Sequence, residues 1–130
     1  MSKKWKVAGI DFSHMHMGDN LKYAFDHPDV DIVGICHHER EPMESSIKNF
    51  DISEDRVFTD YKECLEQTNP DIIILCSATA RHAESVEQVA PYGAHIMVEK
   101  PFASSLAEAD RMVAAISDNQ QLIINWPLMW

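Results

Sequence analysis

The sequence predicts an α/β fold: a single domain, residues 1–130, in which helices cover both faces of a doubly wound parallel sheet of six strands. Short apolar segments with strand character alternate with amphipathic helical segments along the whole chain. In addition, residues 71–76 are apolar without alternation, which is typical of a strand that is covered on both faces. Right-handed crossovers between such strands make 3-2-1-4-5-6 the expected strand order.

The expected strands are short runs of apolar and β-branched residues bounded by turn signals. They are residues 5–10, 30–36, 56–58, 71–76, 94–98 and 122–125.

The five expected helices carry apolar residues at helical spacing, as Met17 and Leu21 do in the first and Met112 and Ile116 in the last. Asp60 and Ser105 are predicted N-caps, because a glutamate follows each of them three residues later. The first helix is expected to end at His27, before Pro28, and the second is a short helix at 42–50. Gly93 is expected to end the fourth helix as its C-terminal glycine, and the fifth should end near Asp118.

The composition narrows the class of protein. A net charge of −10 argues against a nucleic-acid partner, and no apolar run approaches the ~20 residues of a membrane span. The N-terminus has no signal-peptide pattern. Cys36, Cys64 and Cys76 form no C-x-x-C motif, and we interpret them as buried free thiols in a reducing compartment. The sequence therefore predicts a cytoplasmic protein.

The chain ends in an apolar stretch, residues 126–130, that contains two tryptophans, a leucine and a methionine. Such a stretch would be costly to leave exposed. We therefore expect a second domain or a partner beyond Trp130.

The turn after the first strand is a candidate phosphate site that lacks a glycine fingerprint. Dinucleotide-binding folds carry G-x-G-x-x-G in this turn. Here Asp11, Ser13 and His16 occupy the three glycine positions, and Phe12 and His14 lie between them. Ser13 would still let backbone N–H groups approach a phosphate, whereas Asp11 would repel one unless its side chain turns away.

The end of the second strand is where an acidic residue usually binds the adenine ribose of a dinucleotide. The sequence there reads His37-His38-Glu39-Arg40, and His37 occupies the position of the acid. Glu39 could bind a ribose hydroxyl, while His38 and Arg40 could face a 2′-phosphate. The choice between NAD and NADP stays open.

A metal site is not predicted. His14, His16 and the histidines at 37–38 lie at the ends of neighbouring strands, and Asp11 is a further possible ligand. However, no three of these residues have a recognised ligand spacing. We interpret the imidazoles as polar loop groups that are near a ligand or solvated.

The loop after residues 71–76 leaves the centre of the sheet. We expect Ser77, Ala78, Thr79 and His82 to line a ligand, because Ser77 and Thr79 offer hydroxyl groups and His82 begins a helix. The alternative is a plain N-capping turn.

The sharpest signal is Glu99-Lys100-Pro101 at the end of an apolar strand, where charges must be paired or functional. Lys100 is the candidate catalytic residue, since a mobile ammonium group can orient a hydroxyl, a carbonyl or a ribose. Glu99 and Pro101 are expected beside the cofactor. The alternative is a structural ion pair with a turn stiffened by proline.

The whole of residues 6–125 resembles the N-terminal nucleotide-binding domain of the glucose–fructose oxidoreductase/inositol dehydrogenase (Gfo/Idh/MocA) family. The similarity is carried by residues 57–65, 71–82 and 93–103. It implies a Rossmann-type domain that binds NAD or NADP and acts on a sugar, a cyclitol or a related hydroxy or oxo compound. It also implies that Lys100 lies beside the nicotinamide, and that His82 and the loop before it line the cofactor.

The resemblance further implies a C-terminal α/β domain that supplies a catalytic Asp/His pair and the surface of a homo-oligomer. We therefore expect residues 1–130 alone to be inactive. The alternative is a non-enzymatic binding or assembly module that has kept the fold and lost ordinary dinucleotide binding.

Overall fold

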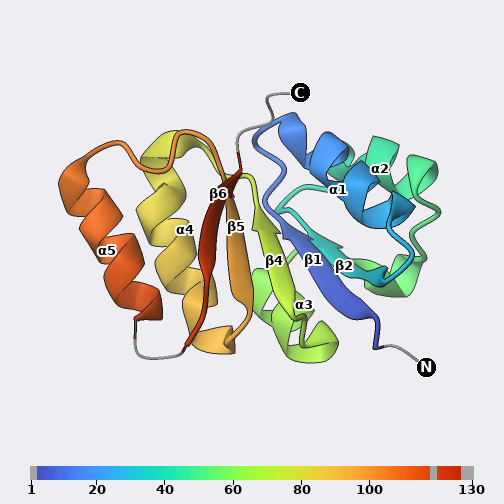
Figure 1. The fold of residues 1–130 in the computed structure, drawn as a ribbon. Helices are drawn as coiled ribbons and strands as arrows, with labels where there is room; N and C mark the ends of the chain where they lie inside the picture. Colours follow the sequence, from blue (N-terminus) through green and yellow to red (C-terminus); the bar gives the residue numbers. More distant parts are fainter. Residues whose placement is uncertain (1–2, 118–119, 127–130) are drawn as a thin grey trace.

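The computed structural model describes residues 3–117 and 120–126, which form one parallel sheet with helices on both faces (Figure 1). The strand order is β3-β2-β1-β4-β5-β6, which confirms the predicted order. The strands are β1 (Trp5–Ile10), β2 (Val30–Cys36), β3 (Val57–Phe58), β4 (Ile72–Leu75), β5 (His95–Glu99) and β6 (Ile123–Trp126).

The helices divide between the two faces of the sheet. Those on one face are α1 (His16–Asp26) and α2 (Glu44–Asn49), and those on the other are α3 (Tyr61–Thr68), α4 (His82–Val89) and α5 (Leu106–Ile116). Each face has its own cluster of buried apolar side chains. This is the doubly wound arrangement that the alternating pattern predicts.

Most element limits differ from the expected ones by one or two residues, as is usual at the ends of elements. The third strand begins at Val57 rather than at residue 56, because Arg56 ends a 3₁₀ turn, Glu54–Arg56. The helix expected at 42–50 is a 3₁₀ turn, Glu41–Met43, followed by α2. The expected helix end at Asp118 and the stretch 127–130 lie outside the described residues.

The predicted helix caps are present. Asp60 Oδ1 accepts a hydrogen bond from Lys62 N at 3.0 Å, and Ser105 Oγ accepts one from Glu108 N at 3.2 Å. The reciprocal bond of the second cap reaches one residue further back than in a standard capping box, since the Glu108 carboxylate accepts from Ser104 N. Gly93 has a φ of +82° and ends the 3₁₀ turn that extends α4.

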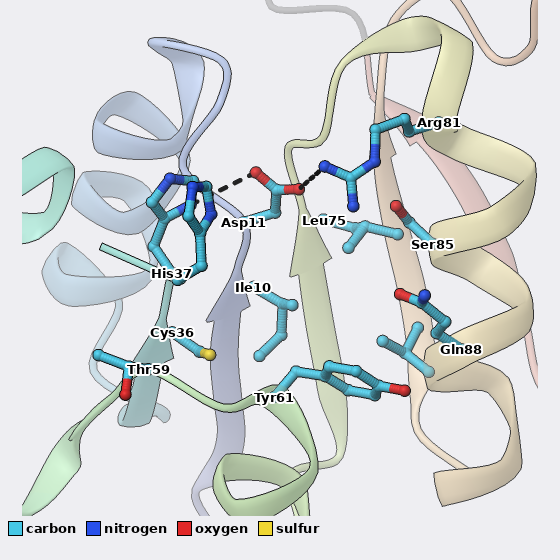
Figure 2. Close-up of a pocket in the computed structure, with 12 residues that line it drawn as sticks. Ile10, Asp11, Cys36, His37, Thr59, Tyr61, Leu75, Arg81, Ser85 and Gln88 are labelled. Atoms are coloured by element: carbon cyan, nitrogen blue, oxygen red, sulfur yellow. Dashed lines mark ion pairs between the residues drawn. The ribbon is translucent and has the colours of Figure 1, made fainter. Parts of the chain in front are cut away.

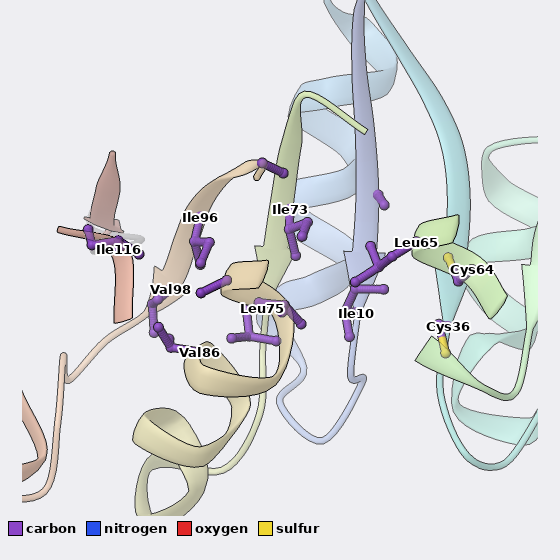
Figure 3. Packing of buried hydrophobic residues seen from close by; sticks show 14 of the residues in the cluster. Ile10, Cys36, Cys64, Leu65, Ile73, Leu75, Val86, Ile96, Val98 and Ile116 are labelled. Atoms are coloured by element: carbon purple, nitrogen blue, oxygen red, sulfur yellow. The ribbon is translucent and has the colours of Figure 1, made fainter. Parts of the chain in front are cut away.

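Strand β4 is buried on both faces, which explains its continuous apolar sequence. Ile73 and Leu75 belong to the cluster beneath α3, α4 and α5, which also contains Val86 and Val98 (Figure 3). Ile74 belongs to the opposite cluster, beneath α1 and α2.

The three cysteines are buried free thiols, as predicted. Burial raises the pKa of each of them to about 12. No helix in the described part of the chain combines the length and the apolar character that crossing a bilayer requires.

Candidate functional site

A cavity opens where the carboxyl ends of β1, β2 and β4 meet (Figure 2). Strand β2 lies on one side of β1 and β4 lies on its other side. The strand order therefore reverses between β1 and β4, next to this cavity. Open α/β sheets bind their ligands at this point. The cavity has a volume of about 120 Å³, is open to solvent, and is smaller than the 300–1,000 Å³ that is usual for a complete ligand site. Its lining residues are Ile10, Asp11, Cys36, His37, His38, Thr59, Tyr61, Leu75, Arg81, Ser85, Gln88 and Val89.

Asp11 is an acidic residue in the lining of this cavity. Its φ of 69° lies in the left-handed region, which aspartate tolerates better than most residues do. Asp11 Oδ1 accepts hydrogen bonds from the backbone N–H of Ser13, at 2.9 Å, and from the Ser13 hydroxyl. Arg81 Nη1 lies 3.9 Å from Asp11 Oδ2. The carboxylate therefore turns into the first strand–helix turn, with Arg81 partly balancing its charge (Figure 2).

The backbone N–H groups of Phe12, Ser13, His14 and His16 in this turn already have acceptors. Phe12 N donates to His37 Nδ1 at 2.9 Å, Ser13 N donates to Asp11, and His14 N donates to the Cys76 carbonyl at 3.0 Å. His16 N donates to His14 Nδ1 at 3.1 Å. In a glycine-rich turn, such groups are available to bind a phosphate. Here a phosphate would have to replace side-chain acceptors, of which the Asp11 carboxylate is the charged one.

His37 is almost fully buried beside Asp11, with its Nδ1 3.5 Å from Asp11 Oδ1. Burial lowers the pKa of His37 below its usual value, and it outweighs the opposing effect of the Asp11 charge. Because Nδ1 accepts the Phe12 N–H, the folded protein needs this ring in its neutral form.

The buried His37 should make folding stability depend on pH. The folded state holds the pKa of His37 below the unfolded value of about 6.5, so the unfolded chain binds more protons in the interval between the two values. The free energy of unfolding should therefore decrease as the pH falls from 7.5 toward 5.5. In His37→Asn, whose amide oxygen can still accept the Phe12 N–H, this decrease should be smaller. Urea unfolding at a series of pH values measures both slopes.

Between pH 7.5 and 9, His37 is neutral in both the folded and the unfolded state. The difference in stability between wild type and His37→Asn should therefore stay constant there, which serves as the internal control. Equal slopes below pH 6.5 would show that His37 does not carry the effect.

The predicted loop residues lie at different depths. Ser77 is buried, Thr79 is half-buried, and Ala78 is exposed. The ring of His82 is 1% exposed and bridges two loops: Nε2 lies 2.9 Å from the Ser77 carbonyl oxygen and Nδ1 lies 3.1 Å from that of Phe102. His82 therefore connects the loop after β4 to the loop after β5.

At the end of β5, Glu99 is 2% exposed and Lys100 is exposed. The Lys100–Pro101 peptide bond is cis. The partner of Glu99 is His16, whose Nδ1 lies 2.9 Å from Glu99 Oε1. Among the described residues Lys100 makes no ion pair, so the alternative of a structural Glu99–Lys100 pair is wrong.

The structure sorts the predicted site residues into groups. Asp11, Phe12, Ser13 and His37 are joined by hydrogen bonds at the cavity. A second group, His14, His16 and Glu99, lies at the start of α1 and the end of β5. The other predicted residues occupy the two loops that His82 connects, and they are Ser77, Ala78, Thr79, Lys100 and Pro101.

The sequence prediction missed Arg81, together with Thr59, Tyr61 and Gln88 of the cavity wall. The sequence did hold a signal for Arg81, which follows the apolar strand β4 in the loop that leaves the centre of the sheet.

The lining of the cavity combines apolar side chains with polar groups, as a nucleoside site requires. Ile10, Leu75 and Val89 contribute apolar side chains to the lining, and His37 and Arg81 contribute polar groups. A diphosphate at the start of α1 would have to take the place of the Asp11 carboxylate on Ser13 N.

The strand order and the cavity at the reversal point define a Rossmann-type nucleotide-binding domain. Residues 4–125 match the Gfo/Idh/MocA family model, described as "Oxidoreductase family, NAD-binding Rossmann fold". The chain belongs to this family and corresponds to its NAD-binding domain.

Two curated relatives illustrate the similarity. One is a myo-inositol 2-dehydrogenase of Thermotoga maritima, 36% identical over 59 residues, which are 45% of this chain and 18% of the relative. Another is a D-apiose dehydrogenase of Paraburkholderia graminis, 30% identical over 103 residues, which are 79% of this chain and 25% of the relative. The chain thus spans a quarter or less of the length of these relatives.

Among solved structures, GenD2 from gentamicin A biosynthesis, in complex with NAD, superposes with a TM-score of 0.83 at 22% identity. The match covers 96% of this chain and 35% of GenD2. Structures with this fold include complexes with NAD and with NADP. At this level of identity the likeness shows the fold.

Proposed function

We propose that the chain is the dinucleotide-binding domain of an NAD(P)-dependent oxidoreductase that acts on a sugar, a cyclitol or a similar hydroxy or oxo compound. The observation that carries the proposal is the cavity at the reversal point of the sheet, in a chain of the Gfo/Idh/MocA family. The names of the relatives, myo-inositol 2-dehydrogenase and D-apiose dehydrogenase, support a polyhydroxylated substrate.

In this proposal the adenosine lies in the cavity, with its ribose near His37 and its diphosphate on the turn from Asp11 to His16. Arg81 lies beside Asp11 at the cavity mouth, where it can pair with a phosphate that displaces the Asp11 carboxylate. The nicotinamide end extends past the loop of residues 77–79 toward Lys100.

Lys100 has the catalytic role in the proposal. It is exposed at the end of β5, and the described residues offer it no ion pair, so its ammonium group is available to a ligand. There it orients the hydroxyl or carbonyl group of the substrate by hydrogen bonding. The bound nicotinamide supplies the hydride chemistry.

Acid–base catalysis is assigned to a C-terminal α/β domain, which also forms the surface of a homo-oligomer. The match to only 35% of the length of GenD2 supports this part of the proposal, because it leaves room for such a domain. The cell compartment is proposed to be the cytoplasm, in line with three free buried thiols.

The test is a titration of the 130-residue chain with NADH and with NADPH, followed by nicotinamide fluorescence. One cofactor should bind saturably. Ser13→Trp should weaken binding at least about tenfold, because an indole ring at the turn blocks the diphosphate path. The matched control is Ser45→Trp on the exposed side of α2, which should leave affinity unchanged within about twofold. Equal effects of the two substitutions would contradict the proposed binding mode.

The engaged N–H groups of the first turn favour a second candidate, a non-enzymatic binding or assembly module. If neither cofactor binds saturably, in this chain and in one that includes the expected C-terminal domain, the second candidate replaces the first.

A further inference from the structure

Three side chains with metal-ligating groups meet beside the cavity. His14 and His16 come from the loop and the first residue of α1, and Glu99 comes from the last residue of β5. Each offers one ligand atom, and these three atoms all lie within 4.8 Å of one another. The fold brings the histidines to Glu99 across more than eighty residues of sequence.

The distances are close to those of a coordinated cation. Ligand atoms at ~2.0–2.2 Å from a tetrahedral Zn²⁺ are ~3.3–3.6 Å apart. The candidate ligand atoms all lie within 4.8 Å of one another, so a movement of about 1.5 Å or less brings any pair of them to this spacing. His16 Nδ1 and Glu99 Oε1 are 2.9 Å apart in a hydrogen bond, which an ion held by these two atoms would replace. A rotation of the half-buried imidazole rings of His14 and His16 can supply such a movement.

Glu99 supplies the second, independent observation. Its side chain is 1% exposed, and its pairing with His16 uses only Oε1. Among the described residues, Oε2 has no hydrogen-bond partner. A buried carboxylate oxygen without a partner is costly, and a cation at this position would remove that cost.

His14 also has a ring nitrogen that carries no proton. Its Nδ1 accepts the N–H of His16 at 3.1 Å, so an ion bound at this nitrogen would take the place of the His16 N–H. Metal ions bind a histidine nitrogen in this unprotonated form.

We propose that His14, His16 and Glu99 bind a divalent transition-metal ion. Two imidazoles with one carboxylate form a ligand set of the catalytic zinc type, which leaves a fourth position for water or a substrate oxygen. Imidazole ligands favour Zn²⁺ and its first-row neighbours over Mg²⁺ and Ca²⁺. The proposal does not depend on dinucleotide binding, because it uses only contacts within this chain.

The sequence did not predict this site, because the H-x-H pair has no third ligand at a recognised spacing. Asp11 was a further possible ligand by its place in the sequence, but its carboxylate is bound to the Ser13 N–H. Glu99, the residue that completes the set, was assigned to the cofactor instead.

The test is a titration of the 130-residue chain, first stripped with a chelator, with Zn²⁺ by calorimetry and with Co²⁺ by visible absorption. We expect one ion per chain and an increase in Tm on addition of Zn²⁺. His14→Gln, His16→Gln and Glu99→Gln should each weaken binding by at least about tenfold, since even second-shell changes cost 10–100-fold. His27→Gln, at the exposed far end of α1, is the matched control and should stay within about twofold of wild type.

Glu99 is buried, so circular dichroism must show that each variant is folded. His14→Gln, in a half-buried loop position, keeps the test valid if Glu99→Gln does not fold. Absence of saturable binding of one ion, or equal weakening by His27→Gln and His14→Gln, would overturn the proposal.

Discussion

Asp11→Gly should bind NADH or NADPH about 10- to 100-fold more tightly than the wild-type chain does. The substitution removes the carboxylate that accepts the Ser13 N–H, and so returns this donor to a phosphate. A hydrogen bond to a charged group contributes about 1.5–3 kcal/mol, which corresponds to the stated change in affinity. Glycine adopts the φ of 69° at this position without strain, so the turn should keep its shape. The fluorescence titration described above measures the effect.

Asp11→Asn is the matched variant, because it removes the charge while its amide oxygen can still accept the Ser13 N–H. Its gain in affinity should be clearly smaller than that of Asp11→Gly. If both variants bind equally tightly, charge repulsion alone limits the wild type. If neither variant binds better than wild type, the diphosphate does not use this turn.

The fold could be predicted from the sequence because its signals are local. A strand buried on both faces, such as β4, must be apolar at every position, and helix caps such as Asp60 act within three residues. The residues at which helices and strands begin and end were less predictable. Arg56 belongs to a 3₁₀ turn rather than to a strand, and the difference between the two is a matter of a few backbone angles.

The site was only partly predictable because its decisive contacts are not local. The sequence showed that Asp11 stands where a glycine is usual, but not that its left-handed φ points the carboxylate at Ser13 N. The pairing of His16 with Glu99 depends on the neighbourhood of β1, β4 and β5 in the sheet. Arg81 reaches Asp11 only because β4 lies next to β1.

The second large effect is expected at His82, which we assign a positioning role. His82→Leu should lower the free energy of unfolding by about 1–3 kcal/mol, because it removes the ring N–H that serves the carbonyl oxygens of Ser77 and Phe102 and leaves a buried carbonyl without a donor. These carbonyls belong to the two loops that carry Thr79 and Lys100. The same substitution should therefore also weaken cofactor binding at a temperature where the variant is still folded. Urea unfolding and the fluorescence titration measure the two effects.

Two comparisons separate this bridging role from the general cost of replacing a histidine. His38→Leu changes an exposed histidine and should alter stability by no more than about 0.5 kcal/mol. His82→Gln retains an amide with two N–H groups and should recover part of the loss, since it can still donate to a carbonyl. A loss below about 0.5 kcal/mol in His82→Leu would mean that water replaces the ring between the loops. The loop after β5 would then be held in place by its own packing, and the position of Lys100 would not depend on His82.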